Sequence, residues 1–187
     1  MLIRHADPAG DSAACAAIYA PFVTDAVTSF EYQPPDSSDF AGRIARLSAS
    51  HAFLVAEDED DGAVAGFAYG SPHKERTAYS WAAEVSVYIA ATHHRRGVGR
   101  ALYGVLFDLL ERQGFRIVLA GITLPNDASV GIHEAFGFRP LGVYRKIGFK
   151  FGAWHDVGWW QRPLGAGDAP AGDPPGPPVL LSDDGGR

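Results

Sequence analysis

The feature that most constrains this chain is a short strand pattern followed closely by a basic, glycine-containing turn and a helical pattern. The strand pattern is Val85-Ser86-Val87-Tyr88-Ile89, and the turn that follows is His94-Arg95-Arg96-Gly97-Val98-Gly99-Arg100. Apolar residues then recur at helical spacing, at Val98, Leu102, Val105, Leu106 and Leu109. The sequence therefore predicts a strand, a turn and the N-terminus of a helix in close succession.

The start of that helix is expected to bind an anion. The first amides of a helix have no partner within the helix, and they carry partial positive charge. Gly97 and Gly99 lack the side chains that would hold a phosphate away from these amides, so we expect a pyrophosphate site. The spacing is neither that of a P-loop nor that of a dinucleotide fingerprint, whose third glycine would fall at Leu102. A basic turn whose glycines only ease the helix start explains these residues equally well.

Composition indicates one globular domain and limits the choice of partners. The chain has 187 residues and a net charge of −6, which disfavours nucleic acid or an anionic membrane as the main partner. Its single cysteine, Cys15, cannot form an internal disulfide, which is typical of a reducing compartment. No apolar run approaches the length of a membrane span and no signal peptide precedes Asp7-Pro8, so we expect a cytoplasmic protein.

Periodicity and turn residues predict an α/β domain, residues 1–163, with a central mixed sheet. Strands are expected at 2–5, 52–57, 64–70, 82–89 and 116–122, and two more are expected around the turn at 148–152. Helices are expected at 8–20, from a Ser37 or Ser38 cap to about 50, from the glycine turn to about 112, and from an Asn126 cap to Gly137. Residues 164–187 are rich in Pro and Gly and are expected to form a disordered tail.

Glu84 is the strongest candidate for acid–base chemistry. It is the only carboxylate in its strand, and alternation places it on one face with Ser86 and Tyr88. Burial in such a strand would raise the pKa of Glu84 toward neutrality, which suits a general base. A solvent-facing glutamate on a half-exposed strand is the alternative. His133-Glu134 begins a zinc-protease pattern that fails at Gly137, and we expect no metal.

The chain resembles the GNAT superfamily of acyl-CoA N-acyltransferases, whose signature is Gln/Arg-x-x-Gly-x-Gly/Ala. More narrowly, it resembles the phosphinothricin or methionine sulfoximine N-acetyltransferase group, over nearly all of residues 1–163. His94 departs from the signature, since it stands where the family has Gln or Arg. The matching segments include Glu84-Val85-Ser86-Val87-Tyr88-Ile89, Leu124-Pro125-Asn126-Asp127-Ala128-Ser129-Val130, His133-Glu134-Ala135-Phe136-Gly137-Phe138 and Trp154-His155-Asp156-Val157-Gly158.

The resemblance implies a mostly antiparallel, twisted sheet with splayed central strands, flanked by about four helices. It also implies an acetyl-CoA site in which main-chain groups of the splayed strand pair with the pantetheine arm. Glu84 matches the family's proposed base. His133 stands where many members carry a tyrosine near the sulfur, so it is expected to protonate the thiolate or to relay a proton, although a core-edge histidine is nearly as plausible. The residues expected to bind acetyl-CoA are Val87, Tyr88, Ile89, Arg95, Arg96, Gly97, Val98, Gly99, Arg100, Asn126 and Ser129.

Substrate contacts are expected from Phe30, Lys74, Arg76 and Tyr79. Lys74 and Arg76 match two cations that similar proteins carry just before the base strand. The resemblance implies that Phe30 forms a wall of the pocket, although phenylalanine is more often ordinary core. Cations suit an amino acid whose side chain ends in an oxyanion, although Lys74 lacks the bidentate fork of arginine. Ordinary solvation explains both cations equally well. The resemblance also implies a homodimer, packed across the region of Lys150, Trp154 and His155.

The sequence thus predicts an acetyl-CoA-dependent N-acetyltransferase that acts on the α-amine of a small amino acid analogue. Two alternatives stay open: a transferase for protein or peptide amines, and a non-catalytic acyl-CoA-binding module.

Overall fold

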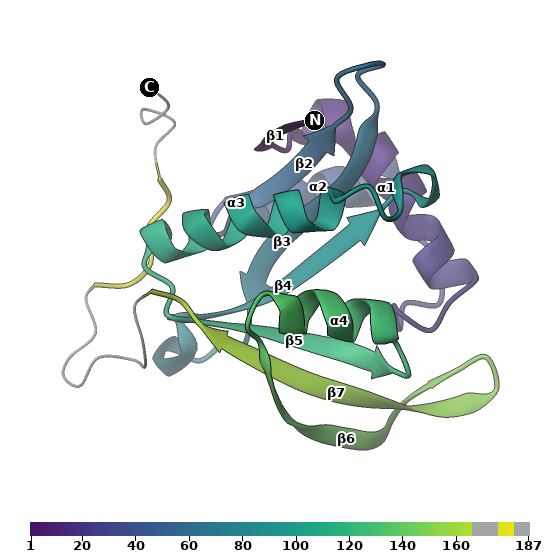
Figure 1. The fold of residues 1–187 in the computed structure, drawn as a ribbon, viewed down its shortest axis with the longest axis vertical. Coiled ribbons are helices and arrows are strands. Elements are labelled where there is room, and N and C mark those ends of the chain that lie inside the picture. The colour runs from purple at the N-terminus through teal and green to yellow at the C-terminus, as the bar shows by residue number, and fades with distance from the viewer. Residues whose placement is uncertain (166–175, 182–187) are drawn as a thin grey trace.

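A computed structural model describes residues 1–165 and 176–181 of the chain. Its strands form one seven-stranded sheet in the order β1-β2-β3-β4-β5-β7-β6, in which only β4 and β5 are parallel neighbours (Figure 1). The strands are β1 Leu2–His5, β2 Phe53–Glu57, β3 Val64–Pro72, β4 Ala82–Ile89, β5 Ile117–Leu124, β6 Arg139–Lys150 and β7 Ala153–Pro163. The expected mixed, mostly antiparallel sheet is confirmed.

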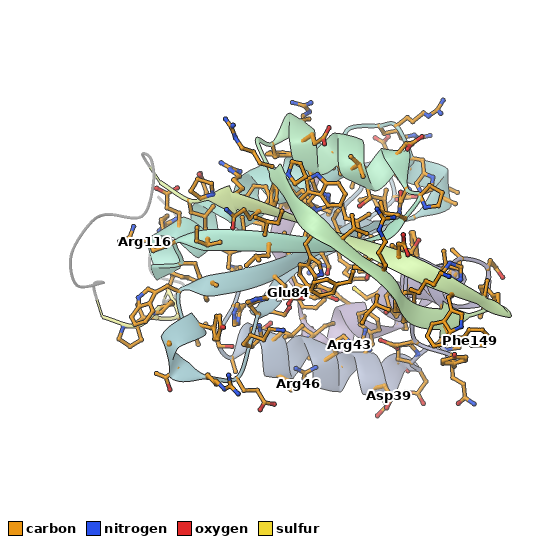
Figure 2. All side chains as sticks on the ribbon, turned by 90° about the horizontal axis from the view of Figure 1, so that it is seen from below. Asp39, Arg43, Arg46, Glu84, Arg116 and Phe149 are labelled. Atoms are coloured by element: carbon orange, nitrogen blue, oxygen red, sulfur yellow. The ribbon has the colours of Figure 1, made fainter. Side chains whose placement is uncertain are left out.

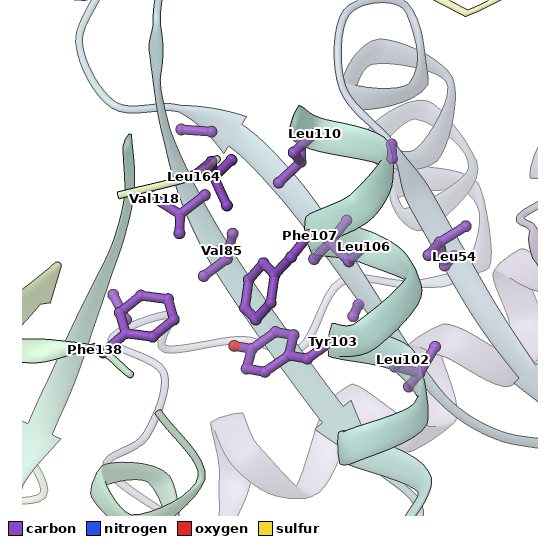
Figure 3. Packing of buried hydrophobic residues seen from close by; sticks show 14 of the residues in the cluster. Leu54, Val85, Leu102, Tyr103, Leu106, Phe107, Leu110, Val118, Phe138 and Leu164 are labelled. Carbon is purple, nitrogen blue, oxygen red and sulfur yellow. The ribbon is translucent and has the colours of Figure 1, made fainter. Parts of the chain in front are cut away.

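In the described part of the chain, four α-helices cover the two faces of the sheet. Helices α1 (Pro8–Thr24) and α2 (Ser37–Ser48) enclose one core cluster, which includes Phe40, Phe53 and Phe67. Helix α3 (Val98–Gln113) crosses the opposite face, and its apolar side chains pack on β2 to β5 (Figure 3). Helix α4 (Asp127–Ala135) lies on the same side as α3 (Figure 1). Two short 3-10 turns, η1 Thr77–Tyr79 and η2 Ala91–His93, flank β4.

Two helix boundaries differ from the sequence-based expectations. Helix α1 continues through Pro21 to Thr24, since Val23 in its last turn is buried in the core. Helix α2 is capped by Asp36 instead of Ser37 or Ser38, because Asp36 and Asp39 form a reciprocal capping box. The sequence-based expectation overlooked Asp36, whose carboxylate accepts from the first amides as well as a serine hydroxyl would.

The parallel pairing of β4 with β5 is short. It runs from Ala82 opposite Ile117 to Glu84 opposite Leu119. Beyond Glu84, β4 stays paired with β3, whereas β5 stays paired with β7 as far as Leu124. The two central strands therefore diverge, as expected, and the main-chain groups of β4 beyond Glu84 that face β5 have no ladder partner on that strand.

The C-terminal segment contacts the folded domain where it is described. Leu164 is buried in the α3 cluster, and its amide donates to the carbonyl of Arg116. The amide of Val179 donates to the carbonyl of Gln113 at the end of α3 (2.9 Å). The folded part therefore includes Leu164. The disordered tail was expected over 164–187, and of these residues 166–175 and 182–187 lie outside the described part of the chain, whereas the main chain at Leu164 and Val179 is hydrogen-bonded to the domain.

Among the helices of the described residues, none combines the length and apolar character needed to cross a membrane.

Candidate active site

The start of α3 has the geometry of an anion cradle. Gly97 precedes the helix in the left-handed region, with φ of 81°, and within the described residues no side chain caps the helix. The first intrahelical bond at this end joins the amide of Ala101 to the carbonyl of Gly97. The amides of Val98 and Gly99 precede that bond at the helix end, where partial positive charge is greatest.

The two glycines of this turn have different tasks. A β-carbon on Gly97 would meet nothing within 4 Å, so Gly97 is required by its backbone conformation and leaves open space at the helix end. A β-carbon on Gly99 would lie 2.9 Å from Ile132 Cδ1, so Gly99 lets α4 pack closely on α3. Only Gly97 therefore fits the expectation of an open approach for a ligand.

The basic residues of the turn surround this helix end. Arg95, Arg96 and Arg100 are all exposed, and the Arg100 guanidinium lies 5.9 Å from the ring centroid of Phe136. Their charge reinforces the positive end of the helix. His94 donates from Nε2 to the carbonyl of Ile89 (3.1 Å), which ties the turn to the end of β4. His94 is the residue that departs from the family signature.

A second histidine anchors the same turn from the other side. His93 is buried, and its Nε2 lies 3.0 Å from Asp58 Oδ2, in the acidic loop between β2 and β3. The amide of Asp60 and then His93 lower the pKa of Asp58. Sequence patterning did not identify this contact, because Asp58 belongs to a run of charges that is typical of a solvated turn.

A narrow pocket lies where β4 and β5 diverge. The expected acetyl-CoA residues Val87, Tyr88, Asn126 and Ser129 line it, together with the candidate His133. Asn126 is both the cap of α4, accepting from the amide of Ser129 at 3.0 Å, and a wall of the pocket. The other lining residues are Thr28, Val85, Ser86, Tyr103, Ala120, Gly121, Ile122 and Thr123.

His133 is buried and paired with Tyr103, a residue that sequence reasoning missed. Nδ1 of His133 lies 2.7 Å from the carbonyl oxygen of Ser129, which can only accept, so Nδ1 carries the proton. Burial lowers the pKa of His133, so the ring is neutral at pH 7 and Nε2 accepts from the Tyr103 hydroxyl (2.9 Å). Tyr103 sits within the apolar stripe of α3, and its need for a buried partner was the available signal.

Glu84 is the last residue of β4 that pairs with β5, just before the two strands diverge. It lies near the middle of the sheet, between the N-terminal helices and the C-terminal strands (Figure 2). Its side chain is 33% exposed, so the deep burial expected for it is not found. Oε1 of Glu84 lies 2.8 Å from Nδ1 of His73, just beyond the end of β3. Sequence analysis did not identify His73, since the pairing depends on the β3–β4 register.

Of the four expected substrate residues, only Tyr79 contacts a residue next to Glu84. Lys74 and Arg76 are exposed on the segment between β3 and β4, and Tyr79 in η1 packs edge-on against His73, with ring centroids 5.7 Å apart. Phe30 packs closely on Gly148 in the β6–β7 hairpin. It does not line the narrow pocket between β4 and β5.

The β6–β7 hairpin combines a buried lysine with an exposed apolar surface. Lys150 is 1% exposed, and Nζ donates to the carbonyls of Val23, Ala26 and Ser29 at 2.6, 3.1 and 2.6 Å. Lys150 is therefore buried within the subunit, whereas the expectation placed it at a subunit interface. The exposed apolar residues of the hairpin are Leu141, Val143, Tyr144, Ile147, Phe149, Phe151 and Trp154.

Comparisons with known proteins agree with this geometry. The family model described as Acetyltransferase (GNAT) domain matches residues 6–159. The chain is 43% identical to phosphinothricin N-acetyltransferase of Streptomyces viridochromogenes over 154 residues, 82% of this chain and 83% of that protein. It is 32% identical to L-methionine sulfoximine/L-methionine sulfone acetyltransferase of Salmonella typhimurium over 171 residues, 91% and 98% of the two chains.

A solved structure shares the whole architecture. The phosphinothricin acetyltransferase of Sinorhizobium meliloti, solved in complex with AcCoA, superposes with a TM-score of 0.87 at 35% identity. The match covers 94% of this chain and 93% of the other.

Proposed function

This chain belongs to the GNAT acetyltransferase family, and from that premise we propose that it acetylates the α-amine of a small amino acid analogue of the phosphinothricin or methionine sulfoximine type. It is an acetyl-CoA-dependent N-acetyltransferase. The observation that carries the proposal is the uncapped start of α3 beside the diverging end of β4 in the described chain, together with relatives named for these substrates.

The donor binds along the main chain. The first amides of α3, next to Gly97, hold the pyrophosphate, and the three arginines of the turn add charge. The pantetheine arm pairs with the main chain of β4 over Val87–Ile89, where β5 has turned away. Asn126 and Ser129 border the arm from α4. This arrangement carries the thioester from the surface to the neighbourhood of Glu84.

Glu84 is the general base. It takes one proton from the substrate ammonium, directly or through a water, and the freed nitrogen attacks the thioester carbonyl carbon. A carbon–nitrogen bond forms, the carbon–sulfur bond breaks, and the second nitrogen proton leaves with the thiolate of CoA. An amide of β4 near Val87 stabilises the oxyanion.

His133 acts in this scheme as an acceptor. Because its proton is on Nδ1 and is donated to Ser129, Nε2 has no proton to give to the thiolate. In this proposal His133 instead orients the hydroxyl of Tyr103, which lines the pocket, and that hydroxyl relays a proton between the substrate nitrogen and the CoA sulfur. The relay role expected for His133 is therefore shared with Tyr103.

The acceptor substrate is recognised by charge and by aromatic surface. Lys74 and Arg76 neutralise the α-carboxylate and a side-chain oxyanion, and Tyr79 forms one wall of the site. Phe30, which packs on Gly148 of the β6–β7 hairpin, is proposed to border the amine site from that side. We place the enzyme in the cytoplasm, together with its co-substrate.

A second copy of the chain covers the exposed apolar surface of the β6–β7 hairpin. Seven apolar side chains, each at least 38% exposed, lie on this one hairpin, which is unusual for a surface in contact with water. Aromatic side chains such as Phe149, Phe151 and Trp154 are enriched in interface cores. We therefore propose a homodimer formed through this hairpin.

A thiol-release assay tests the proposal. Acetyl-CoA and the purified enzyme are supplied in turn with common amino acids, phosphinothricin, methionine sulfoximine and short peptides. Release of CoA with phosphinothricin or methionine sulfoximine, well above that with peptides, is expected. Release only with peptides would contradict the substrate class, and acetyl-CoA binding with no release for any amine would indicate a binding module.

A further inference from the structure

The geometry around Glu84 includes a histidine partner that fixes the carboxylate. The antiparallel register places Ser71 of β3 opposite Glu84 of β4. Residue 73 lies two positions further on, so it falls on the same side as Glu84 and is its diagonal neighbour. Nδ1 of His73 lies 2.8 Å from Oε1 of Glu84. An ionised carboxylate only accepts, so Nδ1–H is the donor of this bond.

The imidazole of His73 is itself held in place. Its ring packs edge-on against Tyr79 and Trp159, with centroid distances of 5.7 and 5.9 Å, both at interplanar angles of 73°. Trp159 is fixed in turn by Gly121 on β5, whose added β-carbon would lie 3.2 Å from the indole. The side chain of His73 is only 16% exposed. Contacts from η1 and β7 therefore determine where Nδ1 points.

We propose that His73 is a positioning residue for the base of the acetyl transfer. The inference rests on the proposed role of Glu84. A glutamate has three side-chain torsions, and the bond from His73 selects one arrangement by engaging Oε1, which leaves Oε2 for the substrate ammonium or its water. A base held in reach of the proton accelerates the chemical step without contributing to the binding of either substrate.

Two substitutions separate this role from packing. His73→Phe keeps a ring between Tyr79 and Trp159 but removes the donor, whereas His73→Asn places an amide nitrogen near the position of Nδ1. A charge-assisted hydrogen bond is worth about ten- to one-hundred-fold in rate, so His73→Phe should lower kcat by about that factor. The KM values and the calorimetric affinity for acetyl-CoA should stay within about twofold. His73→Asn should recover most of kcat, and His5→Phe, on the exposed end of β1, controls for loss of an imidazole elsewhere.

A double-mutant cycle with Glu84→Gln identifies the route of the effect. The glutamine can still accept from His73 but cannot act as a base. If His73 acts only through the base, adding His73→Phe to Glu84→Gln should change the residual kcat by less than about twofold. An equal loss of kcat in both backgrounds, a loss confined to KM, or no recovery with His73→Asn would overturn the inference. Full activity of Glu84→Gln would instead refute the base assignment.

Discussion

Replacing Lys150 by methionine should destabilise the fold and loosen the wall of the active site. Methionine keeps most of the length of the side chain and removes the ammonium. In the structure that ammonium donates to three carbonyls, those of Val23, Ala26 and Ser29, which come from the end of α1 and the segment after it. Without Lys150, these carbonyls lose their common donor at a buried position.

The expected magnitude follows from two opposing effects. Hydrogen bonds from a charged donor contribute about 1.5–3 kcal/mol each, so the three together correspond to roughly 5–9 kcal/mol. Burial lowers the pKa of Lys150, which reflects the cost of removing its charge from water, and that cost disappears in the variant. Because breaking a buried charged contact on one side costs about 3–5 kcal/mol in similar cases, we expect the free energy of unfolding to fall by about 3 kcal/mol.

Urea unfolding followed by circular dichroism measures this change. Lys146→Met is the matched control, because Lys146 is exposed on the same hairpin. The Lys150 variant should also show a raised KM, since Thr28 in the tethered segment lines the pocket. A midpoint within the error of wild type, or an equal shift in both variants, would show that these three bonds do not hold the segment in place.

Further predictions concern the donor site, the proton relay, the dimer and pH. Gly97→Val should weaken acetyl-CoA binding at least about tenfold in calorimetry, since the left-handed backbone costs about 1–2 kcal/mol and the side chain enters open space, whereas Gly104→Ala on the same helix should not. Tyr103→Phe should lower kcat more than KM; unchanged kcat would remove this hydroxyl from the relay. Trp154→Glu should shift the protein toward the monomer in sedimentation velocity. The pKa of Asp11 is lowered: burial raises it, but hydrogen bonds from Arg4 and the Asp7 amide outweigh that effect. The stability that depends on this carboxylate is present above about pH 4 and is lost as pH falls through its folded pKa. Asp11→Asn should flatten that part of the unfolding profile, and a profile unchanged by the substitution would show that other groups cause it.

Local features of this chain could be predicted because local forces decide them. The strand Ala82–Ile89 and the Asn126 cap were predicted at the residues where they are found. Both follow from short-range rules, namely alternation along a strand and capping by a side-chain amide.

Contacts between distant segments could not be predicted in the same way. The bond between His73 and Glu84 depends on a strand register, and the burial of Lys150 depends on where a hairpin meets the end of α1. The expectation for Lys150 came from the resemblance, which implied only that its region packs across a homodimer, and because lysine is almost never fully buried nothing in the sequence indicated an internal position. Tyr103 was missed because a tyrosine within an apolar helix stripe looks like ordinary core.

Because β4 pairs with β5 over only three residues, the proposed donor site can use main-chain groups of β4, whereas the proposed amine site uses side chains. Past Glu84 and Leu119 the opening is created by the course of the two backbones. Along this stretch of β4 the groups left free by β5 are main-chain groups, whereas the exposed segment around Lys74 and Arg76 presents side chains. If the proposed sites are right, substitutions at Lys74 or Arg76 should therefore alter the choice of amine more than the affinity for acetyl-CoA.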